Sequence, residues 1–467
     1  MCKIFIAAML ALALLAPAQT VDRTKPPQTA PIPAYKPPPI QEAQLGNGLQ
    51  VVMVQDPRFP LVSVRLIFMA GMKYDPPELP GLAETAGSLL TEGTKSRPSR
   101  QIAEELATIG GSLTSNTEAD GLNLSGYALS EGLPNLLELL ADVSINANFP
   151  EDEIALRKQN RKQGLLSQMS DPAFLGSQRF TAVVYGRHPY SHVVPTIASL
   201  DKMDRKTLVA FRDTWLTPNN AVLILIGKLP PRIETMKLID DRFGGGQKKE
   251  VPAAPKAALP PPKRQLVLVD RPGSVQADIH VGRLAVTRAN PEYYPLLVGN
   301  VILGGGSSSR LFLDIREKRG FAYDAHTEMR PYKDAGTIAA VTQVRNEVLE
   351  EALPAVLQHL EQMGKERVSA DELSDTKNFL SGTFLLRLET QNGLASQLAT
   401  IRLNGLPNDY LEKYTARLRA VEPDQVLAAS RKYIVPENSA IVVVGDASKI
   451  AKILEKFGTV TVTKAQP

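Results

Sequence analysis

The order of hydrophobic and polar residues divides most of the chain into short strands and amphipathic helices. Two apolar-rich runs, 49–54 and 61–71, flank a polar turn and predict an opening β-hairpin. Later, 133–143 has the apolar spacing of a helix, and 121–129 alternates like a strand. The unbroken apolar run 221–227 is typical of a central strand that is buried on both faces. Strands and helices do not alternate regularly, which favours an α+β fold over a parallel α/β fold.

The same series of elements occurs twice along the chain. Three pairs of stretches match in order: 215–227 with 433–445 at an offset of 218, the strands that end at Asp56 and Asp270 at an offset of 214, and 121–129 with 336–344 at an offset of 215. A chance alignment of β-like runs would not keep this order. The sequence therefore predicts two duplicated α+β domains, each a mainly antiparallel sheet with helices packed on one face.

Proline-rich stretches separate the parts of the chain. The predicted organisation is a signal peptide (1–18), a proline-rich disordered segment (19–40), an N-terminal domain (41–247), a proline-rich linker (248–263), a C-terminal domain (264–458) and a tail (459–467).

The first residues have the anatomy of a secretory signal. A lysine precedes an apolar run, and Ala16-Pro17-Ala18 follows as a small-x-small cleavage site. The alternative, a retained membrane anchor, is disfavoured because the run is short for a bilayer. We therefore expect a periplasmic protein without a membrane span in its mature chain. The only cysteine, Cys2, lies in this segment, so the mature chain has no disulfide and no thiolate.

Composition narrows the function classes further. The 467 residues are 43% hydrophobic and 22% charged, with a formal net charge of +4. This is the composition of a globular protein, and no block of Lys and Arg suggests nucleic-acid binding.

The five histidines offer one weak candidate for a metal site. His188 and His192 are four residues apart, a spacing that can share a zinc ion on a helix. Pro189 lies between them, and no carboxylate lies within this stretch. A loop that packs on the domain surface is therefore the favoured interpretation.

A second candidate lies at residues 303–323, where three glycines and three serines precede a helix. Backbone N–H groups there could hold an anion or a peptide carbonyl. Arg316 and Tyr323 could share a face if the helix continued for two turns, but Gly320 is expected to end it and Tyr323 to begin the next strand. A guanidinium and a phenol that converge can donate to a carbonyl oxygen as it gains charge. On these residues alone, the favoured interpretation is that Arg316 is an ordinary surface arginine and Tyr323 an ordinary strand tyrosine.

Together these features resemble the M16 (pitrilysin-like) zinc peptidase family, over nearly the whole chain that follows the predicted signal. The resemblance rests on residues 45–57, 80–94, 148–154, 215–227 and 303–323, of which the last is the most specific. It implies a two-domain bacterial member of the M16B type.

In active members of that family, the helix that resembles 80–94 carries His-x-x-Glu-His. Two histidines bind zinc, and the glutamate activates the bound water. Here Glu84, Gly87 and Ser88 occupy the three chemical positions, although the residues that frame the motif are present. A further glutamate ligand would fall near 163–164, which are Gln and Gly. The resemblance therefore implies that this chain binds no zinc and hydrolyses nothing alone.

The resemblance also implies that a second part of the machinery is retained. Active members use Arg and Tyr seven residues apart to bind the substrate carbonyl and its oxyanion, and Arg316 and Tyr323 match that spacing. The substrate-binding backbone predicted beside them belongs to Gly304, Gly305, Gly306, Ser307 and Ser308. In some bacterial members, zinc motif and Arg/Tyr pair lie on two different chains. The expected function is thus the non-zinc subunit of a heteromeric endopeptidase, whose homologous partner carries His-x-x-Glu-His and zinc, and whose substrate is an unfolded peptide.

Three alternatives remain open. The first is a catalytically inert scaffold or peptide-binding homologue, which would have no need for both Arg316 and Tyr323. The second is a lone metallopeptidase with unusual ligands such as Glu84, His188 and His192. The third is a homodimer that binds peptides without cutting them.

Overall fold

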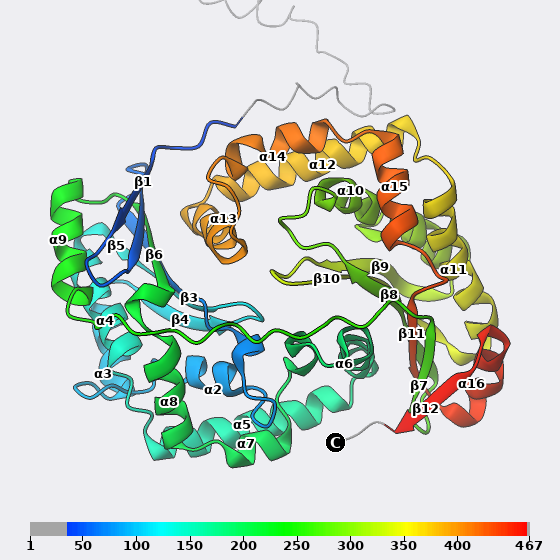
Figure 1. The fold of residues 1–467 in the computed structure, drawn as a ribbon, viewed down its shortest axis with the longest axis horizontal. Helices are drawn as coiled ribbons and strands as arrows, with labels where there is room; N and C mark the ends of the chain where they lie inside the picture. Colours follow the sequence, from blue (N-terminus) through cyan, green and yellow to red (C-terminus); the bar gives the residue numbers. More distant parts are fainter. Residues whose placement is uncertain (1–34, 465–467) are drawn as a thin grey trace, which may run out of the picture. The chain divides into compact units, whose positions relative to one another are not determined.

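The computed structural model describes residues 35–464, and the predicted signal peptide lies outside them. Within this range, the strands form two six-stranded sheets, one from each half of the chain (Figure 1). The first sheet contains β1 (Ile40–Gln44), β2 (Gln50–Gln55), β3 (Leu61–Phe68), β4 (Ser112–Thr117), β5 (Leu122–Leu129) and β6 (Ala221–Gly227). The second contains β7 (Gln265–Asp270), β8 (Gln276–Ala285), β9 (Ala322–Arg330), β10 (Gly336–Arg345), β11 (Ala440–Gly445) and β12 (Val460–Lys464). This is the two-domain α+β architecture predicted from the sequence.

The two sheets have matching strand orders, β1-β2-β6-β3-β5-β4 and β12-β7-β11-β8-β10-β9. The two unbroken apolar runs form β6 and β11, and every residue of both strands is buried. Each lies between a parallel and an antiparallel neighbour, as the pairs Ile226↔Val54 and Ile226↔Ser63 show for β6. The prediction that these runs form central strands is confirmed.

The predicted opening hairpin is wrong. β2 and β3 do not pair, because β6 is inserted between them. A strand with apolar side chains on both faces is stabilised most where a neighbour covers each edge and a layer covers each face. Only the long-range pairing with β6 provides that arrangement.

The helices repeat in the same order in each half. The first half has η1 (Met72–Tyr74), α2 (Leu82–Ser88), α3 (Ser99–Thr108), η2 (Ser130–Gly132), α4 (Leu133–Ile145), α5 (Glu151–Met169), α6 (Pro172–Tyr185), η3 (Pro189–His192), α7 (Ile197–Lys202), α8 (Arg205–Trp215), η4 (Pro218–Asn220) and α9 (Arg232–Phe243). The second has α10 (Tyr293–Gly304), η5 (Phe312–Lys318), η6 (Asn346–Val348), α11 (Leu349–Lys365), α12 (Ala370–Leu388), α13 (Gln391–Asn404), α14 (Tyr410–Arg419), α15 (Pro423–Tyr433), α16 (Ala447–Leu454) and η7 (Glu455–Phe457). The consecutive helices α4, α5 and α6 have counterparts in α11, α12 and α13, which extends the duplication beyond the strands.

Each half lends one helix to the other half's sheet. α6 of the first half contacts β8 and β11, and its counterpart α13 contacts β3 and β6 (Figure 1). Leu175, Phe180 and Val184 of α6 form one apolar cluster with Val442 and Val444 of β11. The sheets therefore carry their own helices on one face and part of a foreign helix on the other.

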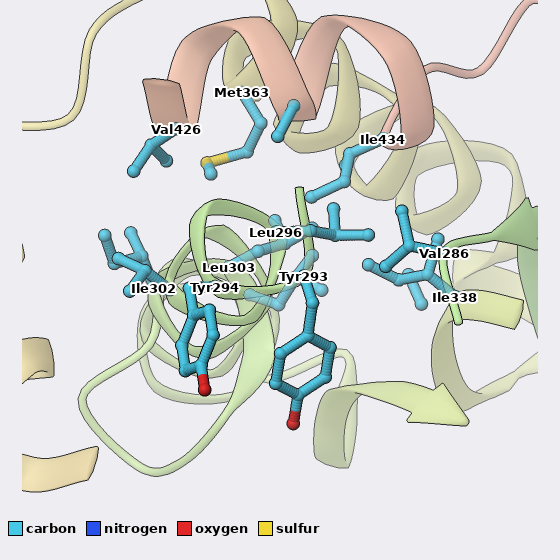
Figure 2. Packing of buried hydrophobic residues seen from close by; sticks show 14 of the residues in the cluster. Val286, Tyr293, Tyr294, Leu296, Ile302, Leu303, Ile338, Met363, Val426 and Ile434 are labelled. Atoms are coloured by element: carbon cyan, nitrogen blue, oxygen red, sulfur yellow. The ribbon is translucent and has the colours of Figure 1, made fainter. Parts of the chain in front are cut away.

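The core of the second half is built around α10. Its side chains Leu296, Ile302 and Leu303 are buried. Figure 2 shows them packed toward residues from α11, α15 and the following loop, namely Met363, Val426 and Ile434. This packing fixes the direction of α10, which ends at the predicted glycine loop.

Two boundaries are informative. Between α9 and β7 the chain runs without regular secondary structure through the proline-rich residues 248–263. Val460–Lys464, expected to belong to a tail, instead form β12, which pairs in parallel with β7. In residues 35–464, none of the helices has the length and apolar character needed to span a membrane.

A buried ammonium joins the two halves at equivalent turns. Lys73 Nζ lies 2.8 Å from Asp120 Oδ1, in the turn between β4 and β5, and 2.8 Å from Asp334 Oδ2, in the turn between β9 and β10. Tyr190 donates a hydrogen bond of 2.6 Å to Asp120 Oδ1. Burial opposes the charge most strongly, but Asp120 and Asp334 outweigh it and raise the pKa of Lys73. The ammonium therefore remains charged and holds the two turns together.

Replacing Lys73 by methionine leaves Asp120 and Asp334 without their shared cation. Loss of one partner from a buried charge pair costs about 3–5 kcal/mol. We expect a decrease of that order in the free energy of unfolding, measured by urea denaturation. Arg100→Met is the control, because it removes only an exposed pair with Glu104, and should change stability by less than about 0.5 kcal/mol. Equal effects of both variants would contradict the bridging role.

Candidate functional site

The helix that the resemblance assigns to the zinc motif is short, and a half-buried carboxylate holds its start. α2 begins after Gly81, whose φ is +89°. Asp75 accepts hydrogen bonds from Gly81 N at 2.7 Å and Ala83 N at 2.8 Å. Burial raises the pKa of Asp75 to about 7, although these hydrogen bonds oppose the shift. Asp75 thus fixes the entry to α2.

The three motif positions on α2 carry no set of metal ligands. Glu84 Oε1 lies 2.8 Å from Arg161 Nε and 3.6 Å from Arg157 Nη2, both on α5. Gly87 has no side chain, and Ser88 Oγ donates to Thr85 O at 2.9 Å. The single carboxylate is already neutralised by two guanidinium groups.

The packing of α2 also leaves no room for a larger side chain in its second turn, at Gly87. A Cβ on Gly87 would lie 2.5 Å from Thr117 Oγ1 of β4 and 3.1 Å from Leu122 Cδ1. Within residues 35–464, no group of three or more His, Cys, Asp or Glu side chains could hold a metal ion. Zinc needs three or four converging donors, so the residues of α2 and α5 do not fit zinc.

The two histidines near η3 differ in environment. His188 is buried, and its Nδ1 accepts from Tyr190 N at 3.3 Å. Its ring lies 4.8 Å from the Tyr190 ring, and burial lowers its pKa. His192 is exposed. The alternative ligand set of Glu84, His188 and His192 is wrong, because these residues form no donor group.

Arg316 and Tyr323 do meet. Arg316 lies on η5, a π-helical turn, and Tyr323 lies at the start of β9. Gly320, with φ of +63°, reverses the chain between them. The Arg316 guanidinium carbon lies 5.0 Å from the Tyr323 ring centroid and 4.6 Å from that of Phe312. A turn, rather than one continuous helix face, brings the pair together, as expected from Gly320.

The pair is open to solvent. Tyr323 is 85% exposed, and the Arg316 side chain is 36% exposed. Arg316 Nε has a carboxylate partner, Glu317 Oε1, only at 3.5 Å. Both groups can therefore donate hydrogen bonds to a molecule that reaches this surface.

The glycines before η5 have separate structural roles. A Cβ on Gly304 would lie 2.4 Å from Thr327 N, so glycine allows α10 to approach the backbone of β9. A Cβ on Gly305 would meet Val301 Cα at 2.5 Å, whereas Gly306 has open space around it. Residues 305–308, which include Ser307 and Ser308, are exposed. Their proposed contact with a peptide remains a prediction.

An ion pair anchors the end of this loop. Arg310 Nε lies 2.7 Å from Glu372 Oε1, and its Nη2 lies 2.9 Å from Oε2, at the start of α12. The guanidinium lowers the pKa of Glu372 to about 2. The exposed loop is therefore held at both ends, by Gly304 against β9 and by Arg310 against α12.

Two family models match the chain. Insulinase (Peptidase family M16) matches residues 50–175, and Peptidase M16 inactive domain matches residues 202–380. Together they cover more than half of the sequence. The chain belongs to peptidase family M16. α2 lies in the first matched segment, and the Arg316–Tyr323 pair of this M16 chain lies in the second.

Curated M16 relatives are named as proteases. YmxG of Bacillus subtilis (strain 168), named an uncharacterized zinc protease, is 23% identical over 388 residues, which are 83% of this chain and 93% of the relative. Rv2782c of Mycobacterium tuberculosis, also named an uncharacterized zinc protease, is 25% identical over 410 residues, 87% of this chain and 93% of the relative.

Solved structures share the complete architecture. A Pseudomonas fluorescens protein described as a peptidase M16 inactive domain has a TM-score of 0.82 and 27% identity, and the match covers 87% of this chain and 98% of that one. A Helicobacter pylori protease has a TM-score of 0.80 and 19% identity, and the match covers 87% of this chain and 99% of that one. This similarity shows that the two proteins share a fold.

Several residues that shape this M16 site escaped sequence reasoning. Arg157 and Arg161 are four apart and share one face of α5, but no local signal connects Arg161 to Glu84, 77 residues earlier. Asp75 precedes α2 by seven residues, which is outside the spacing of an ordinary N-cap.

The contact between α2 and β4 can be tested with alanine. Gly87→Ala should lower the free energy of unfolding by about 1–3 kcal/mol because its Cβ overlaps Thr117. Gly164→Ala on α5 is the matched control, since the nearest atom, Arg161 Nη1, is 3.9 Å away. Gly164→Ala should raise the free energy of unfolding by up to about 1 kcal/mol, because alanine has a higher helix propensity than glycine. Stabilisation by both changes in urea denaturation would disprove the packing argument.

Asp75 predicts a dependence of stability on pH. Its pKa is about 7 in the folded chain and about 3.9 when unfolded. The folded state therefore binds the proton more tightly, and ionisation of Asp75 removes stability as pH rises from about 4 to about 7, by at most about 1.4 kcal/mol per unit. Asp75→Asn cannot titrate. Relative to it, the wild type should lose stability across this window in urea denaturation, and parallel pH profiles would contradict the prediction.

Proposed function

We propose that this chain is the non-zinc subunit of a heteromeric M16-type endopeptidase. In this proposal a homologous partner carries His-x-x-Glu-His and holds the zinc, and this chain contributes Arg316 and Tyr323. The predicted signal peptide would place the complex in the periplasm. Unfolded peptides are the proposed substrates.

The approach of Arg316 to Tyr323 carries the proposal. A guanidinium within 5.0 Å of a phenol ring sets two donors side by side on an exposed surface. Such donors stabilise a carbonyl oxygen most strongly when negative charge develops on it. A purely structural arginine would more usually be buried or paired with a carboxylate at closer range.

The contacts of α2 support the proposal that zinc binding and substrate binding lie on two different chains. Glu84 is bound by Arg161, and Gly87 is pressed against Thr117. In residues 35–464, α2 and α5 therefore offer no set of ligands for the metal, and the proposed contribution of this chain is to bind and orient the substrate.

The neighbouring loop would help to hold an extended peptide. Exposed backbone groups of residues 305–308 lie directly before Arg310 and η5. β9 is an edge strand of its sheet, so its free backbone groups can pair with an added strand. In this arrangement, the pair Arg316 and Tyr323 would meet the carbonyl group while the backbone fixes the register.

The first experiment is a pull-down of the mature chain from periplasmic extract, with mass spectrometry and an assay for chelator-sensitive peptide cleavage. We expect recovery of a homologous chain with His-x-x-Glu-His and activity that needs both chains. Metal analysis of this chain alone should find no stoichiometric zinc. Recovery of a lone, zinc-free, inactive protein would replace the proposal by an inert scaffold or peptide-binding role.

Within the two-chain enzyme, Tyr323→Phe removes one donor while keeping the ring beside Arg316. Loss of one such donor typically lowers turnover on the order of 100-fold or more. We expect this loss in kcat, with unchanged assembly in size-exclusion chromatography. Tyr127→Phe, at another exposed tyrosine, is the control and should keep full turnover. Wild-type kcat in Tyr323→Phe would overturn the assigned role.

A further inference from the structure

A cavity of about 600 Å³ lies beside the N-terminal end of α10. Its walls come from the residues before α10, from the turn between α13 and α14, and from α14 itself. Pro291, Pro295, Leu406 and Pro407 provide rigid apolar surface. This volume is in the range of pockets that hold small molecules.

The charges that line the cavity have one sign. Arg288 and Arg417 are its charged lining residues, and no Asp or Glu lines it. Within residues 35–464, Arg288 has no carboxylate at ion-pair distance, and its Nη1 donates to Tyr410 Oη at 3.5 Å. Arg417 has Asp409 only at 3.8 Å. A half-buried guanidinium without a counter-charge is costly, which favours an anion in the cavity.

Tyrosines add neutral donors to the same cavity. The Tyr294 hydroxyl is buried and has no hydrogen-bond partner of good geometry among the described residues. Figure 2 shows the rings of Tyr293 and Tyr294 pointing away from the labelled aliphatic side chains, with their oxygens at the far ends. Burial raises the pKa of Tyr294 and of Tyr410. Both phenols therefore stay protonated and can donate.

An aromatic ring lies beside each of the two arginines. The Arg288 guanidinium lies 5.3 Å from the Tyr293 ring centroid, and that of Arg417 lies 6.0 Å from Tyr294. The rings hold the guanidinium groups by cation–π attraction without neutralising them. The cavity thus combines two available cations with apolar and aromatic walls.

We propose that this cavity binds a small organic anion, whose carboxylate or phosphate group is held by Arg288 and Arg417 and whose apolar body packs on the tyrosine and proline walls. Inorganic ions alone would leave the apolar walls uncovered. A neutral aromatic molecule would leave Arg288 without a counter-charge and Arg417 with only the 3.8 Å contact to Asp409.

The cavity is distinct from the Arg316–Tyr323 surface. It lies at the N-terminal end of α10, whereas the glycine loop follows the C-terminal end. α10 has 12 residues, so its two ends are about 18 Å apart. Binding at the cavity can therefore be measured without the peptidase partner, and it stands or falls independently of the proposed function.

The test is isothermal titration calorimetry of the purified chain with phenyl phosphate and with phenylacetate. We expect one site per chain with a Kd below about 1 mM for at least one of them. Arg288→Met and Arg417→Met should each weaken binding about 10-fold or more, because each removes a charged donor. Arg417 is partly exposed, so its variant keeps the test valid if Arg288→Met does not fold. Arg367→Met, at an exposed arginine paired with Asp424, should bind like the wild type.

Benzyl alcohol and inorganic phosphate separate the two parts of the ligand. Weaker binding of both than of the aromatic anion supports the proposal. Equal binding of inorganic phosphate would overturn the apolar component, and equal binding of benzyl alcohol would overturn the anionic one. No heat from either aromatic anion, or unchanged affinity in a folded Arg417→Met variant, would overturn the site.

Discussion

The architecture depends on one buried ammonium between two equivalent turns. Lys73 meets Asp120, beside β4, and Asp334, beside β9, both at 2.8 Å. These turns close the edge hairpins of the two sheets. The protein therefore joins its duplicated halves at corresponding points, and an uncompensated charge there would oppose any separation of the halves. Tyr190, which donates to Asp120, ties the segment after α6 to the same junction.

That junction is reinforced by the exchange of helices. Val442 and Val444 of β11 pack on α6, while Val222 and Ile224 of β6 belong to the same apolar core as α13. If either half were alone, one face of its central strand would be open to water, at a cost proportional to the apolar area. The two sheets and their exchanged helices therefore form one cooperative structure, even though each half retains the order of elements of a complete domain.

Local patterns in the sequence predicted the helices and strands. Contacts between distant segments determined how the strands pair and which charged side chains meet, and local patterns did not predict these. The apolar run of β6 predicted a central strand, because apolar side chains on both faces of a strand must be covered. The predicted opening hairpin is wrong because β6 lies between β2 and β3 in the sheet. Arg316 and Tyr323 were assigned as a pair through the resemblance to the family, whose seven-residue spacing they match. The residues alone favoured a surface arginine and a strand tyrosine. Lys73 and Arg161 were missed because each meets its partner only after distant segments fold together, and no residue near either one in the sequence indicates the contact.

The two halves use the same glycine contact with opposite consequences. On α2, Gly87 lets the helix press against Thr117 of β4, and the strand fills the space that a larger side chain at this motif position would need. On α10, Gly304 lets the helix end against Thr327 of β9. The edge strand β9, which carries Tyr323, is thereby fixed relative to the loop that leads to Arg316. The same kind of helix–strand contact thus removes room for a larger side chain at Gly87 in the first half and holds a pair of donors in the second.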